Sequence, residues 1–139
     1  MRIHCFAFTE LMRVASQKQN SNEGASYVGV SSVASVHGNK AQGAYAAAKN
    51  AMNGIIHPFA KELAAKNIRV NTIAFGMVDT EMYRRDFLEA GGNNEELLKE
   101  QILGVIPVEY AGNAVCFLLS DAAMYITGSM FQYDAGALS

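Results

Sequence analysis

Apolar and polar residues follow two different periods along the chain. Over residues 5–18 the apolar positions recur at near-helical spacing, which predicts a helix, and the polar residues 20–24 end it as a loop. Residues 26–31, 68–75 and 129–134 are short apolar runs bounded by glycine or polar residues, and they predict strands. The first has the composition of a strand buried on both faces of a parallel sheet, and the second alternates apolar residues and predicts a second buried strand.

The segments between these runs have helical character. Residues 44–66 are rich in Ala, Lys, Glu and Leu and predict a long helix, in which Pro58 predicts a kink or local break just before it. Residues 79–103 predict one or two short helices interrupted by a Gly-Gly-Asn-Asn run, and residues 109–119 predict a further helix. Residues 32–43 are small and polar and predict a loop.

This alternation of helices and strands is that of an α/β fold with a parallel sheet, and we expect one domain over residues 1–139. Three strands are few for such a sheet, because soluble proteins usually cover the apolar edge of an outer strand. We therefore expect further strands to belong before Met1.

Composition narrows the classes of function. The formal net charge of −2 and the pI of about 5.9 argue against a nucleic-acid or anionic-membrane surface, and the apolar stretches are shorter than the roughly 18–20 residues of a membrane span. The N-terminal residues lack the apolar region of a signal peptide. Cys5 and Cys116 lie far apart among apolar neighbours, so we expect free, buried thiols in a reducing cytoplasm. No cysteine and histidine have metal-ligand spacing, so we expect no metal site.

Tyr45 and Lys49 lie four residues apart on the predicted long helix, so their side chains share one face. An ammonium beside a phenol favours the phenolate, and such a phenol can act as a general acid towards a carbonyl oxygen or a general base towards an alcohol. The pair alone is weak evidence, because a Tyr-x-x-x-Lys on a helix surface is more often a solvated pair.

Two further segments place candidate residues at one edge of the predicted sheet. Ser32 stands at the C-terminal end of the first strand, and Phe75-Gly76 ends the second and leads into residues 77–80. Open α/β sheets bind ligands at this edge, so we expect reactive groups to converge there. Ser32 has the alternative role of forming a turn, and Thr80 is also suited to be the N-cap of a helix that begins directly after it.

These residues resemble the short-chain dehydrogenase/reductase family, and the resemblance covers essentially the whole chain. Ser32, thirteen residues before Tyr45, and Lys49, four residues after it, match the family's Ser…Tyr-x-x-x-Lys pattern. Three more segments match in order: residues 68–74 with the strand after the catalytic helix, 75–80 with the Pro-Gly-x-(Val/Ile)-x-Thr segment, and 117–136 with the closing helix and strand.

The resemblance implies the C-terminal part of a doubly wound, Rossmann-type parallel sheet and NAD(P)-dependent hydride transfer between the nicotinamide and a ketone or secondary alcohol. It implies that Tyr45 transfers the proton to or from the substrate oxygen. Ser32 would hydrogen-bond this oxygen, and Lys49 would favour the ionised phenol and hold the nicotinamide ribose. By the same resemblance the cofactor contacts come from Tyr45, Lys49, Gly76, Val78 and Thr80.

Within the family the chain is most similar to the 3-oxoacyl-[acyl-carrier-protein] reductases, because the enoyl reductase branch spaces the tyrosine and lysine more widely. The expected substrate is a 3-oxoacyl thioester or another small ketone or alcohol. Both NADP and NAD remain open as cofactor, since the residue that reads the adenosine ribose would precede Met1. The helices over 5–18 and 44–66 resemble those that pair subunits, which implies a homo-oligomer, a dimer or a tetramer. A second hypothesis is therefore a catalytically silent interaction piece.

The chain departs from the family pattern in four places. It contains no strand followed by the Gly-x-x-x-Gly-x-Gly turn that receives the cofactor pyrophosphate, so by this comparison the first strands of the fold are absent from it. His4 stands where the family usually has the asparagine of a proton relay. Phe75 replaces the usual proline, and Ala135 stands where many members carry glycine. We therefore expect these 139 residues by themselves to be inactive.

Overall fold

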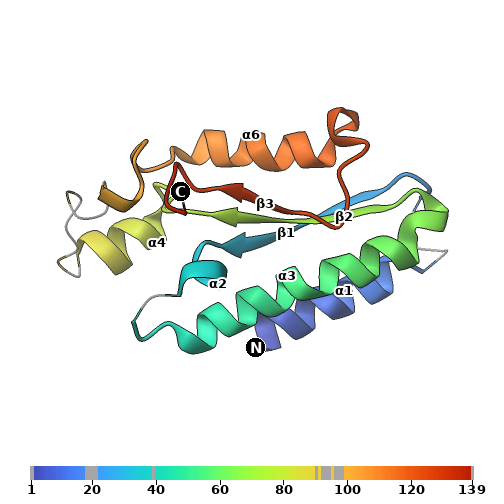
Figure 1. Ribbon diagram of the computed structural model, residues 1–139, viewed down its shortest axis with the longest axis horizontal. Coiled ribbons are helices and arrows are strands. Elements are labelled where there is room, and N and C mark those ends of the chain that lie inside the picture. The colour runs from blue at the N-terminus through green and yellow to red at the C-terminus, as the bar shows by residue number, and fades with distance from the viewer. Residues whose placement is uncertain are drawn as a thin grey trace.

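The computed structural model describes a three-stranded parallel sheet with helices on both faces (Figure 1). The described residues are 2–17, 22–38, 40–89, 91, 95 and 99–138. The strands are β1 (Ser26–Ser32), β2 (Arg69–Phe75) and β3 (Met130–Tyr133), paired in the order β1-β2-β3. These bounds confirm the three predicted strands within about two residues at each end.

The register of the sheet brings its three C-terminal ends together. Ser32 pairs with Phe75, and Phe75 pairs with Tyr133, so each strand finishes at the same edge. β2 is the central strand, and its residues from Arg69 to Ala74 are all buried. A strand covered on both faces needs apolar or internally bonded side chains, and the polar Arg69 and Asn71 donate to the backbone carbonyls of Leu118 and Ile126.

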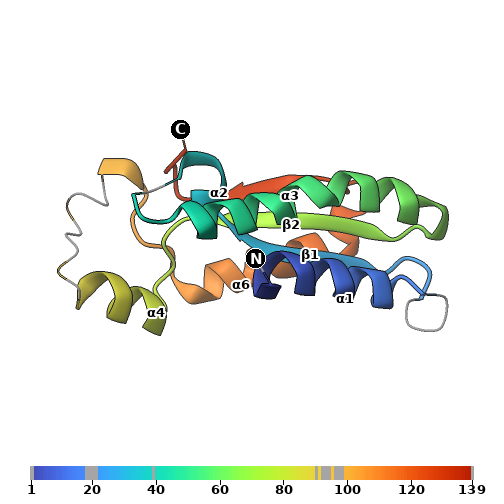
Figure 2. The same cartoon turned by 90° about the horizontal axis from the view of Figure 1, so that it is seen from below.

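Helices η1 (Arg2–Phe6), α1 (Ala7–Ala15) and α3 (Gly43–Leu63) cover one face of the sheet, and α6 (Val108–Leu119) covers the other (Figures 1 and 2). On the first face Met12 packs with Ile56 and Leu63 of α3. On the second, Leu118 and Ala114 of α6 pack on Ile73 of β2.

Helix α3 runs unbroken through Pro58, so the predicted local break is wrong. Pro58 is exposed, whereas Ile56, Ala60 and Leu63 on the other side of the helix are buried against the sheet. Burial of this apolar face opposes the loss of one backbone hydrogen bond at the proline. A 3₁₀ turn (Ala64–Lys66) and left-handed Asn67 then end the helix, as the prediction over 44–66 required.

The remaining elements surround the strand ends. Residues 32–43, expected as a loop, contain the short helix α2 (Ala34–His37). Helix α4 (Glu81–Tyr83) continues into the π-helical turn η3 (Arg84–Leu88), and part of the predicted Gly-Gly-Asn-Asn interruption lies outside the described residues. No helix in the described part of the chain is long and apolar enough to cross a membrane.

The expectation that Cys116, on helix α6, is buried is wrong. Its buried positions are Ala111, Ala114 and Leu118, spaced by three and four residues, and this spacing turns Cys116 outward. Cys116 is therefore exposed rather than buried, while Cys5 is half-buried, and both thiols are free. The C-terminal carbonyls of α6 at Leu118 and Ser120 accept hydrogen bonds from the buried guanidinium of Arg69, which satisfies an end that would otherwise be unpaired.

Candidate active site

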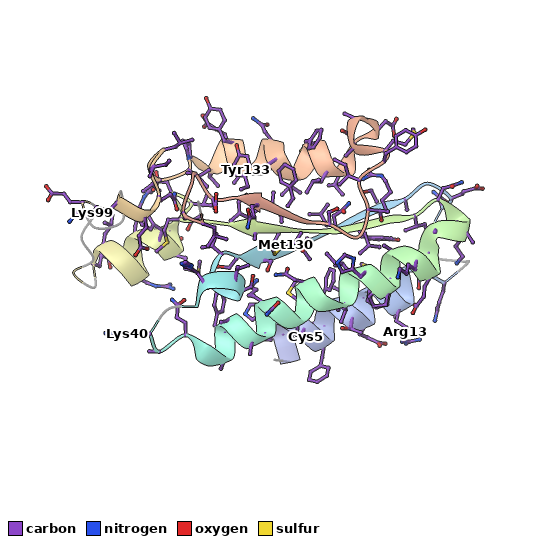
Figure 3. All side chains as sticks on the ribbon, viewed as in Figure 1. Cys5, Arg13, Lys40, Lys99, Met130 and Tyr133 are labelled. Atoms are coloured by element: carbon purple, nitrogen blue, oxygen red, sulfur yellow. The ribbon has the colours of Figure 1, made fainter. Side chains whose placement is uncertain are left out.

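A cavity of about 940 Å³ lies at the C-terminal edge of the sheet, between α3, α6 and the loop after β2. It brings together every candidate residue of the sequence analysis: Ser32, Tyr45, Lys49, Gly76, Val78 and Thr80. His4 lines it as well. Lys40, before α3, and Lys99, before α6, lie at the same end of the molecule as this edge (Figure 3). Residues far apart in the sequence thus share one concave site, which is the placement expected for ligands of an open α/β sheet.

Tyr45 and Lys49 lie on successive turns near the N-terminal end of α3. The Tyr45 side chain is 37% exposed, while Lys49 is only 7% exposed. The Lys49 ammonium donates to the carbonyl oxygen of Val30 in β1 at 2.8 Å and lies 5.7 Å from the centroid of the Tyr45 ring. Burial lowers the pKa of Lys49 from its ordinary value. The site therefore keeps a poorly hydrated cation beside an accessible phenol, the combination that acid–base chemistry on an oxygen substituent needs.

Ser32 closes β1 and begins the turn into α2. Its Oγ accepts a hydrogen bond from the Ala34 amide at 3.2 Å, so the turn-forming role considered as an alternative is present. This bond uses the oxygen as acceptor, and the Ser32 O–H remains able to donate to a ligand in the cavity. The structural and the chemical roles of Ser32 are compatible.

A pair of hydrogen bonds braces Ser32 from behind. Asn53 Nδ2 donates to Ser35 Oγ at 2.8 Å, and Ser35 Oγ donates to the Ser32 carbonyl oxygen at 2.6 Å. The same Asn53 amide reaches Met130 Sδ at 3.1 Å, so it connects α3, α2 and β3. Sequence reasoning missed Asn53, although it lies one helical turn after Lys49 and is an amide in an otherwise apolar stretch.

His4 in η1 contacts Tyr45 edge to face, with ring centroids 5.7 Å apart and an interplanar angle of 88°. Burial lowers the pKa of His4 from its ordinary value, and the positive charge of Lys49 lowers it further. The structure therefore places at Tyr45 the side chain that replaces the asparagine of the resemblance.

The loop after β2 is held close to β3 and to the segment before α6. The Gly76 amide donates to the Tyr133 carbonyl at 3.2 Å, and the Asp79 amide donates to the Ile106 carbonyl at 2.8 Å. Thr80 Oγ1 accepts from the Tyr83 amide at 3.2 Å, so Thr80 is the N-cap of α4, as the alternative assignment required. Its hydroxyl hydrogen is still available to a ligand.

Two departures from the expected pattern have visible structural consequences. The Phe75 ring packs edge to face on Tyr133, with centroids 5.8 Å apart. At this position an aromatic contact thus replaces the backbone stiffness that a proline would give. Ala135 adopts φ 52°, the left-handed region that glycine reaches without steric cost. This explains why glycine is the common residue at that turn.

Gln101 is the second residue of this region that sequence reasoning missed. It is 1% exposed, borders the cavity and bonds to the backbone of Met77. The chain offers no local pattern that distinguishes it, because two of its three hydrogen bonds join Met77, 24 residues earlier in the sequence. In the part of the chain that the structure describes, no group of three or more His, Cys, Asp or Glu side chains has the arrangement of a metal site.

Comparison with known proteins gives matches over the whole of this arrangement. A family model described as enoyl-(acyl carrier protein) reductase matches residues 1–137. A 3-oxoacyl-[acyl-carrier-protein] reductase of Thermotoga maritima is 37% identical over 117 residues, which cover 80% of this chain and 44% of the relative.

Solved structures agree with these matches. The reductase LugOII, which catalyses keto-reduction at C1 during lugdunomycin biosynthesis, superposes with a TM-score of 0.87 at 25% identity, covering 99% of this chain and 53% of that one. An angucycline C-6 ketoreductase with bound NADP superposes with a TM-score of 0.79 at 25% identity, covering 94% of this chain and 49% of its own. The chain thus spans about half the length of the relatives that it matches.

Proposed function

Because the chain belongs to the short-chain dehydrogenase/reductase family, we propose that its cavity is the reactive half of an NAD(P)-dependent oxidoreductase that interconverts a ketone and a secondary alcohol. One observation carries the proposal. Ser32, Tyr45 and Lys49 line a single cavity together with the loop of residues 76–80, although the chain brings them from three separate elements.

The residues of the cavity suit a nicotinamide cofactor, NADP or NAD. When bound, the cofactor supplies or accepts the hydride. Gly76 has no side chain where the loop leaves β2, Val78 borders the cavity, and the Thr80 hydroxyl can donate to an amide or phosphate oxygen. Lys49 offers hydrogen-bond donors to ribose hydroxyls once its contact with Val30 is exchanged. The pyrophosphate-binding glycine turn is not part of these residues.

The proton chemistry belongs to Tyr45. Its phenol is exposed to the cavity, so it can donate a proton to a carbonyl oxygen during reduction and accept one from a hydroxyl during oxidation. The Lys49 ammonium lies 5.7 Å from the centroid of the Tyr45 ring, so a positive charge stands close to the group that transfers the proton. Ser32 donates a hydrogen bond to the same substrate oxygen and stabilises the charge that develops on it.

The substrate class that fits best is a small ketone, such as a 3-oxoacyl thioester. The four-residue spacing of Tyr45 and Lys49 favours ketone reduction over the enoyl reduction named in the description of the matching family. The Thermotoga maritima relative is a 3-oxoacyl reductase, and the two structural relatives are ketoreductases by name. All three support the ketone without fixing its identity.

A second candidate function is that of a catalytically silent interaction piece. Helix α1 and the turn before it present four exposed apolar side chains at helical spacing: Ile3, Phe6, Leu11 and Val14. Such a face favours association with another subunit. Titration of the purified chain with NADPH and NADH separates the two functions, since saturable binding supports the oxidoreductase and no binding of either cofactor supports the silent piece.

The Tyr45→Phe variant tests the assignment of the proton donor. We expect turnover to fall by about 10²-fold or more while the Kd for the cofactor stays within about twofold, because only the hydroxyl is removed. The measurement is steady-state reduction of a 3-oxoacyl thioester by NADPH, made on the protein expressed with any in-frame sequence that precedes residue 1. Tyr125→Phe, the same change at a 96% exposed tyrosine, is the control. Near-normal turnover in Tyr45→Phe would remove Tyr45 from its role.

A further inference from the structure

A single buried amide connects the loop after β2 to the segment before α6. Gln101 Oε1 accepts a hydrogen bond from the Met77 amide at 2.7 Å, and Gln101 Nε2 donates to the Met77 carbonyl at 3.0 Å. The same Nε2 donates to the Gly104 carbonyl at 2.7 Å. Gln101 is only 1% exposed, so its amide depends on protein partners for hydrogen bonds, and these bonds use both its donor and its acceptor groups.

Glycine at position 76 makes room for this amide. A Cβ at Gly76 would lie 2.4 Å from Gln101 Oε1 and 2.9 Å from the carbonyl oxygen of Asp134. Any side chain at this position would therefore push the amide away from Met77 or move the backbone of the C-terminal turn. The amide of Gln101 therefore occupies the space that a side chain at position 76 would need.

The two hydrogen bonds between the Gln101 amide and the Met77 backbone, here called the clamp, hold the part of the loop nearest to the sheet. Farther along, the loop is held by main-chain bonds, since the Ile106 amide donates to the Met77 carbonyl at 3.0 Å and Val78 pairs with Ile106 as an isolated bridge. The Met77 amide, between Gly76 and Val78, has Gln101 as its partner. Loss of the side-chain amide leaves this part-buried N–H without that bond, which favours movement of the loop towards water.

We propose that Gln101 is a positioning residue, which fixes the loop of residues 76–80 at the distance from the strand edge at which its backbone and Thr80 meet the nicotinamide. For its ligand this inference rests on the proposed function, whereas the clamp itself rests on the contacts of Gln101 alone. Gln101 does not act on the reacting atoms, so it governs cofactor binding more than the chemical step.

The test replaces the amide by a side chain of similar length and compares two readouts. In Gln101→Met we expect the Met77 amide to exchange its hydrogen about tenfold faster or more, measured by NMR or mass spectrometry without cofactor. In the protein expressed with any in-frame sequence that precedes residue 1, we expect the KM for NADPH or NADH to rise about five- to tenfold while kcat stays within about twofold. Gln132→Met, the same change at an exposed glutamine of β3, should alter neither quantity.

Each outcome decides the inference. Unchanged hydrogen exchange at Met77 in a folded Gln101→Met protein overturns the clamp. A fall in kcat of about five- to tenfold with an unchanged KM overturns the positioning role. If the variant does not fold, the unsubstituted protein decides, because rapid exchange of Met77 there overturns the clamp and slow exchange supports it. Met77 protection that depends on Gln101, in a protein that binds neither cofactor, supports the clamp and overturns the proposed function.

Discussion

At the scale of single residues, His4 and Lys49 place two ionisable groups against the same phenol. They approach Tyr45 from different elements, His4 from η1 and Lys49 from α3. Burial lowers the pKa of both groups, and the charge of Lys49 also lowers the pKa of His4. The site therefore holds one cation more readily than two, and protonation of His4 costs free energy as long as Lys49 is charged.

The pKa of His4 provides the first prediction at this scale. We expect an NMR titration to place it below the ordinary value of 6.5, and expect Lys49→Met to raise it part of the way back, since burial remains as the larger cause. The unfolded chain then binds this proton more tightly than the folded chain, so the stability of the fold decreases as the pH falls through about 6.5. Lys61→Met, on the exposed side of α3, is the control. An unchanged titration in Lys49→Met would contradict the coupling.

The site residues divide by how far their contacts reach along the chain. Ser32, Tyr45 and Lys49 form a pattern that spans 18 residues, and Thr80 precedes its helix directly, so the sequence alone predicts them. Asn53 donates to the Ser35 hydroxyl 18 residues earlier, and Gln101 bonds to the Met77 backbone 24 residues earlier, both through amides that any surface position tolerates. A local pattern cannot reveal such contacts, because they exist only after the sheet has brought the segments together.

At the scale of elements, the strands and helices followed from periodicity wherever packing agreed with local preference. The alternating apolar residues over 68–75 predicted a buried strand, and the structure buries Arg69 to Ala74. Pro58 was misleading, because local preference predicted a break, but the buried side of α3 holds the helix together. The turn formed by α2 had no apolar period of its own and was invisible to this reasoning.

The contact between α1 and β1 provides a prediction about stability. Gly29 of β1 lies under the Phe8 ring of α1, and a Cβ there would stand 2.9 Å from two ring carbons and 3.2 Å from the Thr72 methyl group. Gly29→Ala should therefore destabilise the fold by about 1–3 kcal/mol, the usual cost of overpacking a core. Urea denaturation of both proteins measures this difference.

The matched control for Gly29 lies on α3. A Cβ at Gly54 meets nothing within 4 Å, and Gly54→Ala should stabilise the helix by about 0.5–1 kcal/mol. Combining Gly29→Ala with Phe8→Leu should recover part of the loss, since the shorter side chain leaves space for the methyl group. A Gly29→Ala protein as stable as the unsubstituted one would show that α1 moves away from the sheet at little cost.

At the scale of the whole molecule, the layers could be predicted but not the surfaces they leave exposed. Alternating helices and strands imply a sheet covered on both sides, and the structure has this form (Figure 1). The sequence did not show that α1 buries Met12 alone among its residues while Leu11 is 65% exposed and Phe6, just before it, is 63% exposed. Phe8 and Met12 of α1 face the sheet, while the exposed Leu11 leaves a second apolar surface on the helix, and such a surface favours contact with another protein chain.

We therefore expect the apolar face of α1 to hold two copies of the chain together. Leu11→Glu places a charge in the middle of this face, and burying it without a partner costs far more than the lost contact, so the oligomer should dissociate to monomers at micromolar concentration. Leu103→Glu makes the same change at an 83% exposed leucine in the segment before α6 and should leave the oligomer intact. Sedimentation or light scattering measures the mass in each case. If Leu11→Glu keeps the mass of the unsubstituted protein, the subunits meet through another surface, and the exposed residues of α1 need a different partner.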